Sequence, residues 1–81
     1  MPRRNRDTTK YRLASEFTMK SVQEYSRRDL EGFYQQLLGH LGSIDFSRDM
    51  AINFFNTKTC RSEAAYRVGV LVELGNLIKV T

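Results

Sequence analysis

The chain has 81 residues, 41% of them hydrophobic, with 13 basic and nine acidic side chains that give a net charge of +4. A chain of this length makes one small domain, which buries only about 60% of the surface that its unfolded form exposes. No apolar run approaches the roughly 20 residues that span a bilayer, and the N-terminus lacks a signal-peptide h-region. Cys60 is the single cysteine, so no disulfide framework of a secreted mini-protein is possible. The composition predicts a cytoplasmic protein without membrane partners.

All of the excess positive charge lies in residues 1–12. This segment holds five basic residues and one acidic residue, a net charge of +4, whereas the remainder holds eight of each. It has no apolar periodicity, so we expect a disordered basic arm over residues 1–12 and a single domain over residues 13–81. Such an arm contacts nucleic-acid phosphates or serves as a solubilising tail, and both readings stay open at this point.

The first helix is predicted to begin near Arg27. Ser26 suits its N-cap, and Gly42 ends it. One apolar stripe follows the 3.6-residue period of a helix, made of Leu30, Phe33, Tyr34, Leu37, Leu38 and Leu41. The pattern before this helix is ambiguous. We expect an extended segment over residues 16–22, because a strand at the C-terminus would need a partner.

A second helix is predicted from Arg48 to about Asn56, capped by Ser47 or Asp45. The connector over residues 43–46 should point Ile44 and Phe46 inward. The expected inner face of the helix consists of Met50, Ala51, Phe54 and Phe55. Residues 56–59 contain no apolar side chain and suit a turn between two crossing helices.

The last third of the chain predicts a helix followed at once by a strand. The helix would run over residues 60–74, capped by Thr59 or Ser62, with Ala64, Val68, Leu71 and Val72 or Leu74 inside. Gly75 would end it in a left-handed conformation, which a Cβ would penalise. The apolar, β-branched run over residues 77–80 is typical of a strand. The residues that define this pattern, V-x-x-L-x-x-x-G-x-L-I, are Val68, Leu71, Gly75, Leu77 and Ile78.

This pattern, placed after two suitably spaced helices, resembles winged helix-turn-helix domains, in which the recognition helix ends in a glycine and passes into the first wing strand. The resemblance covers residues 26–81. It implies a mainly α (α+β) fold of three helices with a minimal β-sheet, and family members often have a short strand near residues 43–46. The second wing strand and the wing loop have no counterpart after residue 80, so the wing would be truncated.

The resemblance implies a small DNA-binding regulator of transcription or replication, of bacterial, phage or plasmid type. Its partner would be double-stranded DNA, bound in the major groove by the helix over residues 60–74. A monomer this small binds DNA weakly, so a homodimer or a larger protein partner is expected. The predicted contacts are Arg61, Ser62, Tyr66 and Arg67 to the groove, Thr57, Lys58 and Thr59 to phosphate, and Arg3, Arg4 and Arg6 to the minor groove or backbone.

The alternative function is a winged-helix protein-interaction module that docks the same helix face on a polymerase or replication partner. The neutral charge of residues 13–81 and the missing wing favour this alternative, and Glu63 and Glu73 would sit poorly near phosphates. Tyr66 suits either function, as a base or sugar contact or as an anchor in a protein partner.

The sequence does not predict an enzyme, a metal site or a cofactor. His40 is the only histidine and belongs in the last turn of the first helix, where a positive form suits the helix dipole. A metal site would need Cys60 and carboxylates at no recognisable spacing. Cys60 has no nearby histidine to activate it, and we expect it to pack or cap. The Phe54-Phe55 pair is expected in the core.

Overall fold

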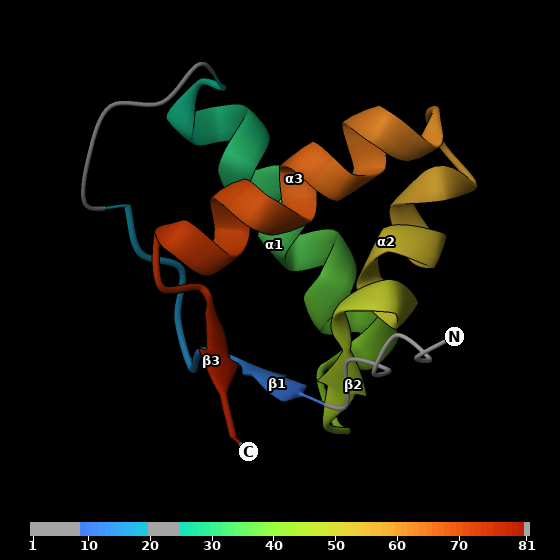
Figure 1. Cartoon of the computed structure of the whole chain (residues 1–81). Helices are drawn as coiled ribbons and strands as arrows, with labels where there is room; N and C mark the ends of the chain where they lie inside the picture. The colour runs from blue at the N-terminus through green and yellow to red at the C-terminus, as the bar shows by residue number, and fades with distance from the viewer. Residues whose placement is uncertain (1–8, 20–24, 81) are drawn as a thin grey trace, which may run out of the picture.

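In the described part of the chain, three helices and three short strands follow one another in the order β-α-β-α-α-β (Figure 1). The computed structural model describes residues 9–19 and 25–80. The elements are β1 (Lys10–Leu13), α1 (Arg27–Leu41), β2 (Phe46–Ser47), α2 (Arg48–Asn56), α3 (Arg61–Glu73) and β3 (Leu77–Lys79). The mainly helical α+β class predicted from the sequence is confirmed.

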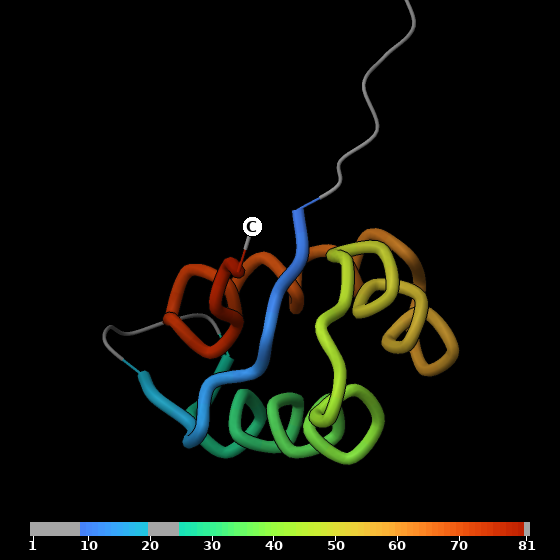
Figure 2. The backbone as a smooth tube through the Cα atoms, turned by 90° about the horizontal axis from the view of Figure 1, so that it is seen from below, coloured from blue at the N-terminus to red at the C-terminus, as the bar shows by residue number. Residues whose placement is uncertain are grey.

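The strands form one antiparallel sheet in the order β2-β1-β3. In Figure 2, β1 runs between β2 and β3 across the open side of the three helices. Tyr11 lies opposite Phe46 on one side and Lys79 on the other, which makes β1 the central strand. Side chains alternate along β1, with Tyr11 and Leu13 buried and Lys10 and Arg12 exposed. The sheet thereby brings residues 10–13 together with residues 77–79, and the side chains of Tyr11 and Leu13 form one buried row on its core face.

Two sequence predictions about this region are wrong. The partner of the C-terminal strand was expected over residues 16–22, yet residues 16–19 form no strand, and residues 20–22 lie outside the described part. The partner is β1, so residues 10–12 belong to the sheet and not to an arm. The reason is the alternation in Lys10–Leu13, which places two apolar side chains on the core face. Residues 1–8 lie outside the described part.

Helices α1 and α2 have the predicted limits because their signals are local. The Ser26 hydroxyl accepts a hydrogen bond from the Asp29 backbone N–H at 3.1 Å, and the Ser47 hydroxyl accepts one from Met50 N–H at 3.3 Å. For α3 the predicted cap was wrong, since the N-cap is Cys60, between the two expected residues. Its extended backbone turns the Cys60 carbonyl into the helix, where it accepts the Ala64 N–H at 2.9 Å.

The core lies where the inner faces of the three helices meet the sheet. Its fully buried large side chains are Leu30, Tyr34, Leu37, Phe46, Phe55, Val68, Leu71 and Leu74. Ile44 and Met50 were expected inside and are exposed, while Phe54 is half-buried. Phe46 is buried opposite Tyr11 of β1, whereas Ile44 lies in the bend before β2 and is exposed. Ala51 and Phe55 already fill the buried face of α2, leaving Met50 and Phe54 to its flank.

Candidate nucleic-acid interface

The turn between α2 and α3 presents a lysine at the surface. Thr57 ends α2, and its hydroxyl donates to the Phe54 carbonyl at 2.7 Å. Lys58 is exposed, with its ammonium 5.5 Å from the centroid of the Phe54 ring. Thr59 is half-buried and precedes the cap of α3. The ring holds the Lys58 stem near the surface of α2 while its charge remains open to solvent.

The outward face of α3 carries the exposed hydroxyl of Ser62 and the ring of Tyr66, which packs against the Tyr25 ring on one side. The helix buries Ala64, Val68 and Leu71 on its inner face. Ser62 and Tyr66 lie one turn apart on the opposite side, since residues four apart share a face, and Tyr66 is 43% exposed. The structure therefore groups two of the predicted contacts on one exposed side of the helix.

Arg61 flanks this face at the N-terminal end of α3. Its Nη1 donates to the Asn53 side-chain oxygen at 2.9 Å, and its Nη2 lies 3.9 Å from an Asp49 carboxylate oxygen. These partners lie on α2 and direct the guanidinium along the junction between the two helices. The side chains of Arg61 and Asp49 are mostly exposed, so the ion pair contributes little stability and leaves the guanidinium free to change partners.

Arg67 was predicted on this face, but the structure places it on the side of α3 that meets α1. Its guanidinium carbon lies 4.3 Å from the centroid of the Phe33 ring and 5.7 Å from that of Phe55. Its Nε is buried without a hydrogen bond, 3.8 Å from a Glu63 carboxylate oxygen. A guanidinium that lies over two aromatic rings from neighbouring helices contributes to helix packing. Arg67 is therefore not grouped with Ser62 and Tyr66.

Arg48 is a residue of this surface that the sequence did not reveal. It begins α2, yet an ideal Cβ built on Gly69 of α3 would lie 3.4 Å from its Nη2. The guanidinium thus lies across α3, over a residue that has no side chain. No local pattern could have indicated this, because the two positions meet only through the crossing of α2 and α3.

Cys60 lies at the same end of α3 and is exposed. Its sulfur is 3.4 Å from the Ser62 hydroxyl. The hydrogen bond with Ser62, followed by one with the Glu63 backbone, lowers the pKa of the Cys60 thiol. As the single cysteine of the chain, it offers a chemical probe at the N-terminus of α3.

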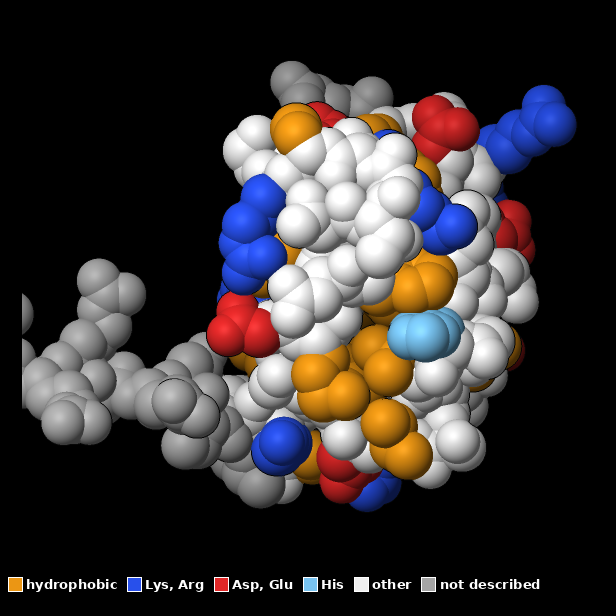
Figure 3. Space-filling model, turned by 90° about the vertical axis from the view of Figure 1, so that its right-hand side faces the viewer, with side chains coloured by type: hydrophobic (Ala, Val, Ile, Leu, Met, Phe, Trp, Pro, Cys, Tyr) orange, Lys and Arg blue, Asp and Glu red, His pale blue; other side chains and the backbone are white. Residues whose placement is uncertain are grey.

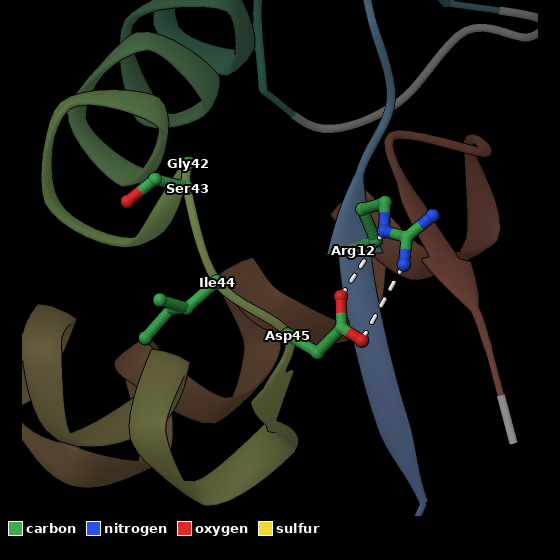
Figure 4. A pocket seen from close by; sticks show the side chains of 5 residues that line it. All are labelled: Arg12, Gly42, Ser43, Ile44 and Asp45. Carbon is green, nitrogen blue, oxygen red and sulfur yellow. Dashed lines mark hydrogen bonds and ion pairs between the residues drawn. The ribbon is translucent and has the colours of Figure 1, made fainter.

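A hollow of about 280 Å³ lies between β1 and the connection from α1 to β2 (Figure 4). Arg12 and Asp45 close one side of it with a two-point contact, 3.0 Å from Nε to Oδ1 and 3.4 Å from Nη2 to Oδ2. Since each charge is already paired with the other, the hollow presents no free charge to a ligand. Arg12 acts here as a link between the sheet and the α1–β2 connection.

Comparison with known proteins gives no match to a family model, to a curated protein or to a solved structure. Within residues 9–19 and 25–80, no three His, Cys, Asp or Glu side chains gather to hold a metal ion. The helices in the same part of the chain are too short or too polar to cross a bilayer. Arg3, Arg4 and Arg6 lie outside the described residues.

Proposed function

We propose that this protein binds double-stranded DNA through the outward face of α3, as a winged-helix domain does with its recognition helix. The observation that carries the proposal is the position of two arginines beside α3. Arg48 lies against Gly69, and Arg61 lies against Asn53 at the start of the helix that exposes Ser62 and Tyr66. Arginine donates two hydrogen bonds to a guanine edge or neutralises a phosphate, and serine binds either. Lys58 in the preceding turn adds a phosphate contact. The N-terminal half of α3 would enter the major groove.

The pairing of β3 supports the winged-helix comparison. In that family the strand after the recognition helix pairs with a second wing strand, and here β1 lies in that place. The Val80 N–H donates to the Lys10 carbonyl at 2.9 Å, so residue 9 leaves the sheet beside the end of β3. Arg6 is four residues from Lys10, at most about 14 Å of chain. We therefore propose that Arg3, Arg4 and Arg6 supply the DNA contact that a wing loop makes elsewhere.

The first test removes the two arginines that flank the α3 face. Arg48→Gln and Arg61→Gln, singly and together, should weaken binding to a fluorescently labelled duplex measured by anisotropy at several salt concentrations. Each variant should also reduce the slope of log affinity against log salt by roughly 0.9, because one phosphate contact is lost. Arg28→Gln is the matched control, since it removes the same charge from the exposed side of α1. Wild-type affinity and slope in the double variant would disprove the proposed surface.

The second test separates binding by α3 from binding by residues 1–8. A duplex seated on α3 should slow alkylation of Cys60 by iodoacetamide, because it would cover the start of the helix. The triple variant Arg3→Gln, Arg4→Gln, Arg6→Gln should bind more weakly yet still show this protection at saturating DNA. Unchanged alkylation of saturated wild-type protein would mean that the basic segment alone holds DNA.

The second candidate function is protein docking through the same face. Tyr66 favours it, because its half-exposed ring lies 5.7 Å from the Tyr25 ring and forms an aromatic surface with it. Glu73 is exposed farther along α3 and would repel phosphates. Apolar docking would respond little to ionic strength, whereas DNA binding should weaken steeply with added salt. The salt series of the first test thus distinguishes the two functions.

A further inference from the structure

Gly69 is the glycine within α3, and it lies on the outward face of that helix. It follows Ser62 by seven residues, which places it about 20° from Ser62 around the helix axis. In residues 9–19 and 25–80, only Gly75 has a positive φ, so Gly69 has a backbone conformation that alanine also adopts. A glycine inside a helix lowers its stability relative to alanine. The backbone of α3 therefore gives no reason for a glycine at this position.

The space above Gly69 is occupied by an arginine from another helix. An ideal Cβ at this position would lie 3.4 Å from the Arg48 Nη2, which is an ordinary contact distance. A longer side chain would compete with the guanidinium for the same space. The other two glycines inside the described helices, Gly32 and Gly39 of α1, have nothing within 4 Å of such a Cβ. Gly69 is thus the helical glycine whose missing side chain makes room for another residue.

The charge of Arg48 is not balanced within the described part of the chain. No carboxylate in residues 9–19 and 25–80 forms an ion pair with it, not even Glu73, one turn beyond Gly69. Arg61, by contrast, lies 3.9 Å from an Asp49 carboxylate oxygen. Arg48 is also the first residue of α2, where the positive end of the helix dipole disfavours a cation. An anion bound from outside the protein would offset both unfavourable features.

Given the DNA binding proposed for α3, on which this inference rests, we propose that Gly69 is a positioning residue of the DNA-binding surface. Because it carries no side chain, Arg48 can place its guanidinium on the outward face of α3, where it binds a phosphate of the DNA backbone. A guanidinium can bind phosphate oxygens through two parallel hydrogen bonds. Such a contact holds the duplex against α3 and carries no sequence information. Arg48 makes this contact only while residue 69 is small.

The test compares Gly69→Gln with Arg48→Gln in anisotropy titrations of a labelled random-sequence duplex at several salt concentrations. Glutamine extends into the space of the guanidinium without adding a charge. Gly69→Gln should weaken binding by the same factor as Arg48→Gln and reduce the slope of log affinity against log salt by roughly 0.9, because the same phosphate contact is lost. Gly69→Ala, whose Cβ would only touch the guanidinium, should bind almost as tightly as the wild type.

The double variant Arg48→Gln, Gly69→Gln separates displacement of Arg48 from direct obstruction of the duplex by the new side chain. If residue 69 acts through Arg48, adding Gly69→Gln to Arg48→Gln should change the affinity by no more than about twofold, because both substitutions remove one contact. A side chain that obstructed the duplex directly would weaken binding equally in either background. Circular dichroism melts should show that Gly69→Gln is at least as stable as the wild type, because glutamine is the better helix former.

Gly39→Gln is the matched control, since it makes the same change at an exposed position of α1. In Figure 3 the single histidine, His40, which follows Gly39 in sequence, is bordered by hydrophobic side chains. The control adds the same side chain to a helix outside the proposed DNA-binding surface. It should raise the melting temperature and keep the wild-type affinity and salt slope.

Three outcomes would overturn the positioning role and leave α3 as the DNA-binding element. The first is wild-type affinity and slope in Gly69→Gln while Arg48→Gln weakens binding. The second is a full further loss when Gly69→Gln is added to Arg48→Gln. The third is wild-type binding by Arg48→Gln while Arg61→Gln weakens it. Wild-type protein that does not bind the duplex even at low salt would disprove the function proposed for α3, and the role of Gly69 with it.

Discussion

Asn76 illustrates how one side chain can organise a segment that has no regular structure. It is the buried polar residue of the described core, fully shielded from solvent. Its side-chain oxygen accepts the Thr18 N–H at 2.7 Å, and its amide nitrogen donates to the Thr18 carbonyl at 3.0 Å. The Asn76 carbonyl also accepts the Ala14 N–H at 2.9 Å. Both ends of residues 14–18 are thereby held against the corner between α3 and β3.

Replacing Asn76 by Ala should destabilise the protein by about 2–3 kcal/mol, because it leaves both backbone groups of Thr18 without their partner in a part-buried site. Asn76→Asp keeps the acceptor but places a carboxylate in a fully buried site facing the Thr18 carbonyl, so at neutral pH it should cost at least as much as Asn76→Ala. The free energy of unfolding in urea measures both. The control Asn56→Ala, at the exposed end of α2, should change it by no more than about 0.5 kcal/mol. Equal losses at the two asparagines would contradict the role assigned to Asn76.

At the scale of the element, α3 depends on how it ends. Gly75 has φ 90°, a left-handed conformation. The Gly75 N–H donates to the Val72 carbonyl at 3.1 Å, and the Asn76 N–H donates to the Leu71 carbonyl at 2.9 Å. This double closure is a Schellman motif, which satisfies the free carbonyls of the last turn. It reverses the chain direction within two residues, so that β3 begins at Leu77, directly after the end of α3.

Two glycine-to-alanine substitutions should have opposite effects. Gly75→Ala should cost about 1–2 kcal/mol, because a Cβ clashes in the left-handed conformation. Gly32→Ala, inside α1 with nothing within 4 Å of the added Cβ, should stabilise by about 0.5–1 kcal/mol, because alanine loses less backbone entropy. Thermal unfolding followed by circular dichroism gives the sign of each change. A neutral or stabilising Gly75→Ala would show that the turn tolerates another backbone geometry.

At the scale of the whole molecule, β1 connects parts of the chain that are far apart in sequence. It pairs with β2 on one edge and β3 on the other, so the sheet exists only when all three segments are assembled. Tyr11 and Leu13 are each only 7% exposed and belong to the same core cluster as the helices. Sheet and helices should therefore unfold together.

Leu13→Ala should lower the free energy of unfolding by about 2–4 kcal/mol, since it opens a cavity where β1 meets the core. Leu38→Ala is the control: the same atoms are removed from a side chain that is 40% exposed, so the loss should stay near 1 kcal/mol or below. Urea unfolding monitored by both tyrosine fluorescence and circular dichroism would give these values. Non-coincident transitions in the wild type would contradict a single cooperative unit.

Much of the candidate site could be anticipated from local pattern. Arg61, Ser62 and Tyr66 were predicted to be presented by α3, because a helical period assigns each position to a face once Ala64, Val68 and Leu71 are inside. The same reasoning misplaced Arg67, whose guanidinium lies over the rings of Phe33 and Phe55. The helical period gives the angular position of each residue around the axis of one helix. It contains no information about which neighbouring helix offers an aromatic surface.

The sequence by itself determined the local structure: the limits of α1 and α2, the serine caps, and the left-handed glycine after α3. Each of these depends on interactions within about one helical turn. Tertiary structure alone decided the strand that pairs with β3, the position of Arg48 against Gly69, and the exposure of Ile44 and Met50. These features join residues from separate elements. Which side chains are buried depends on how all of the elements share one closely packed core, so these features form only when the complete chain packs.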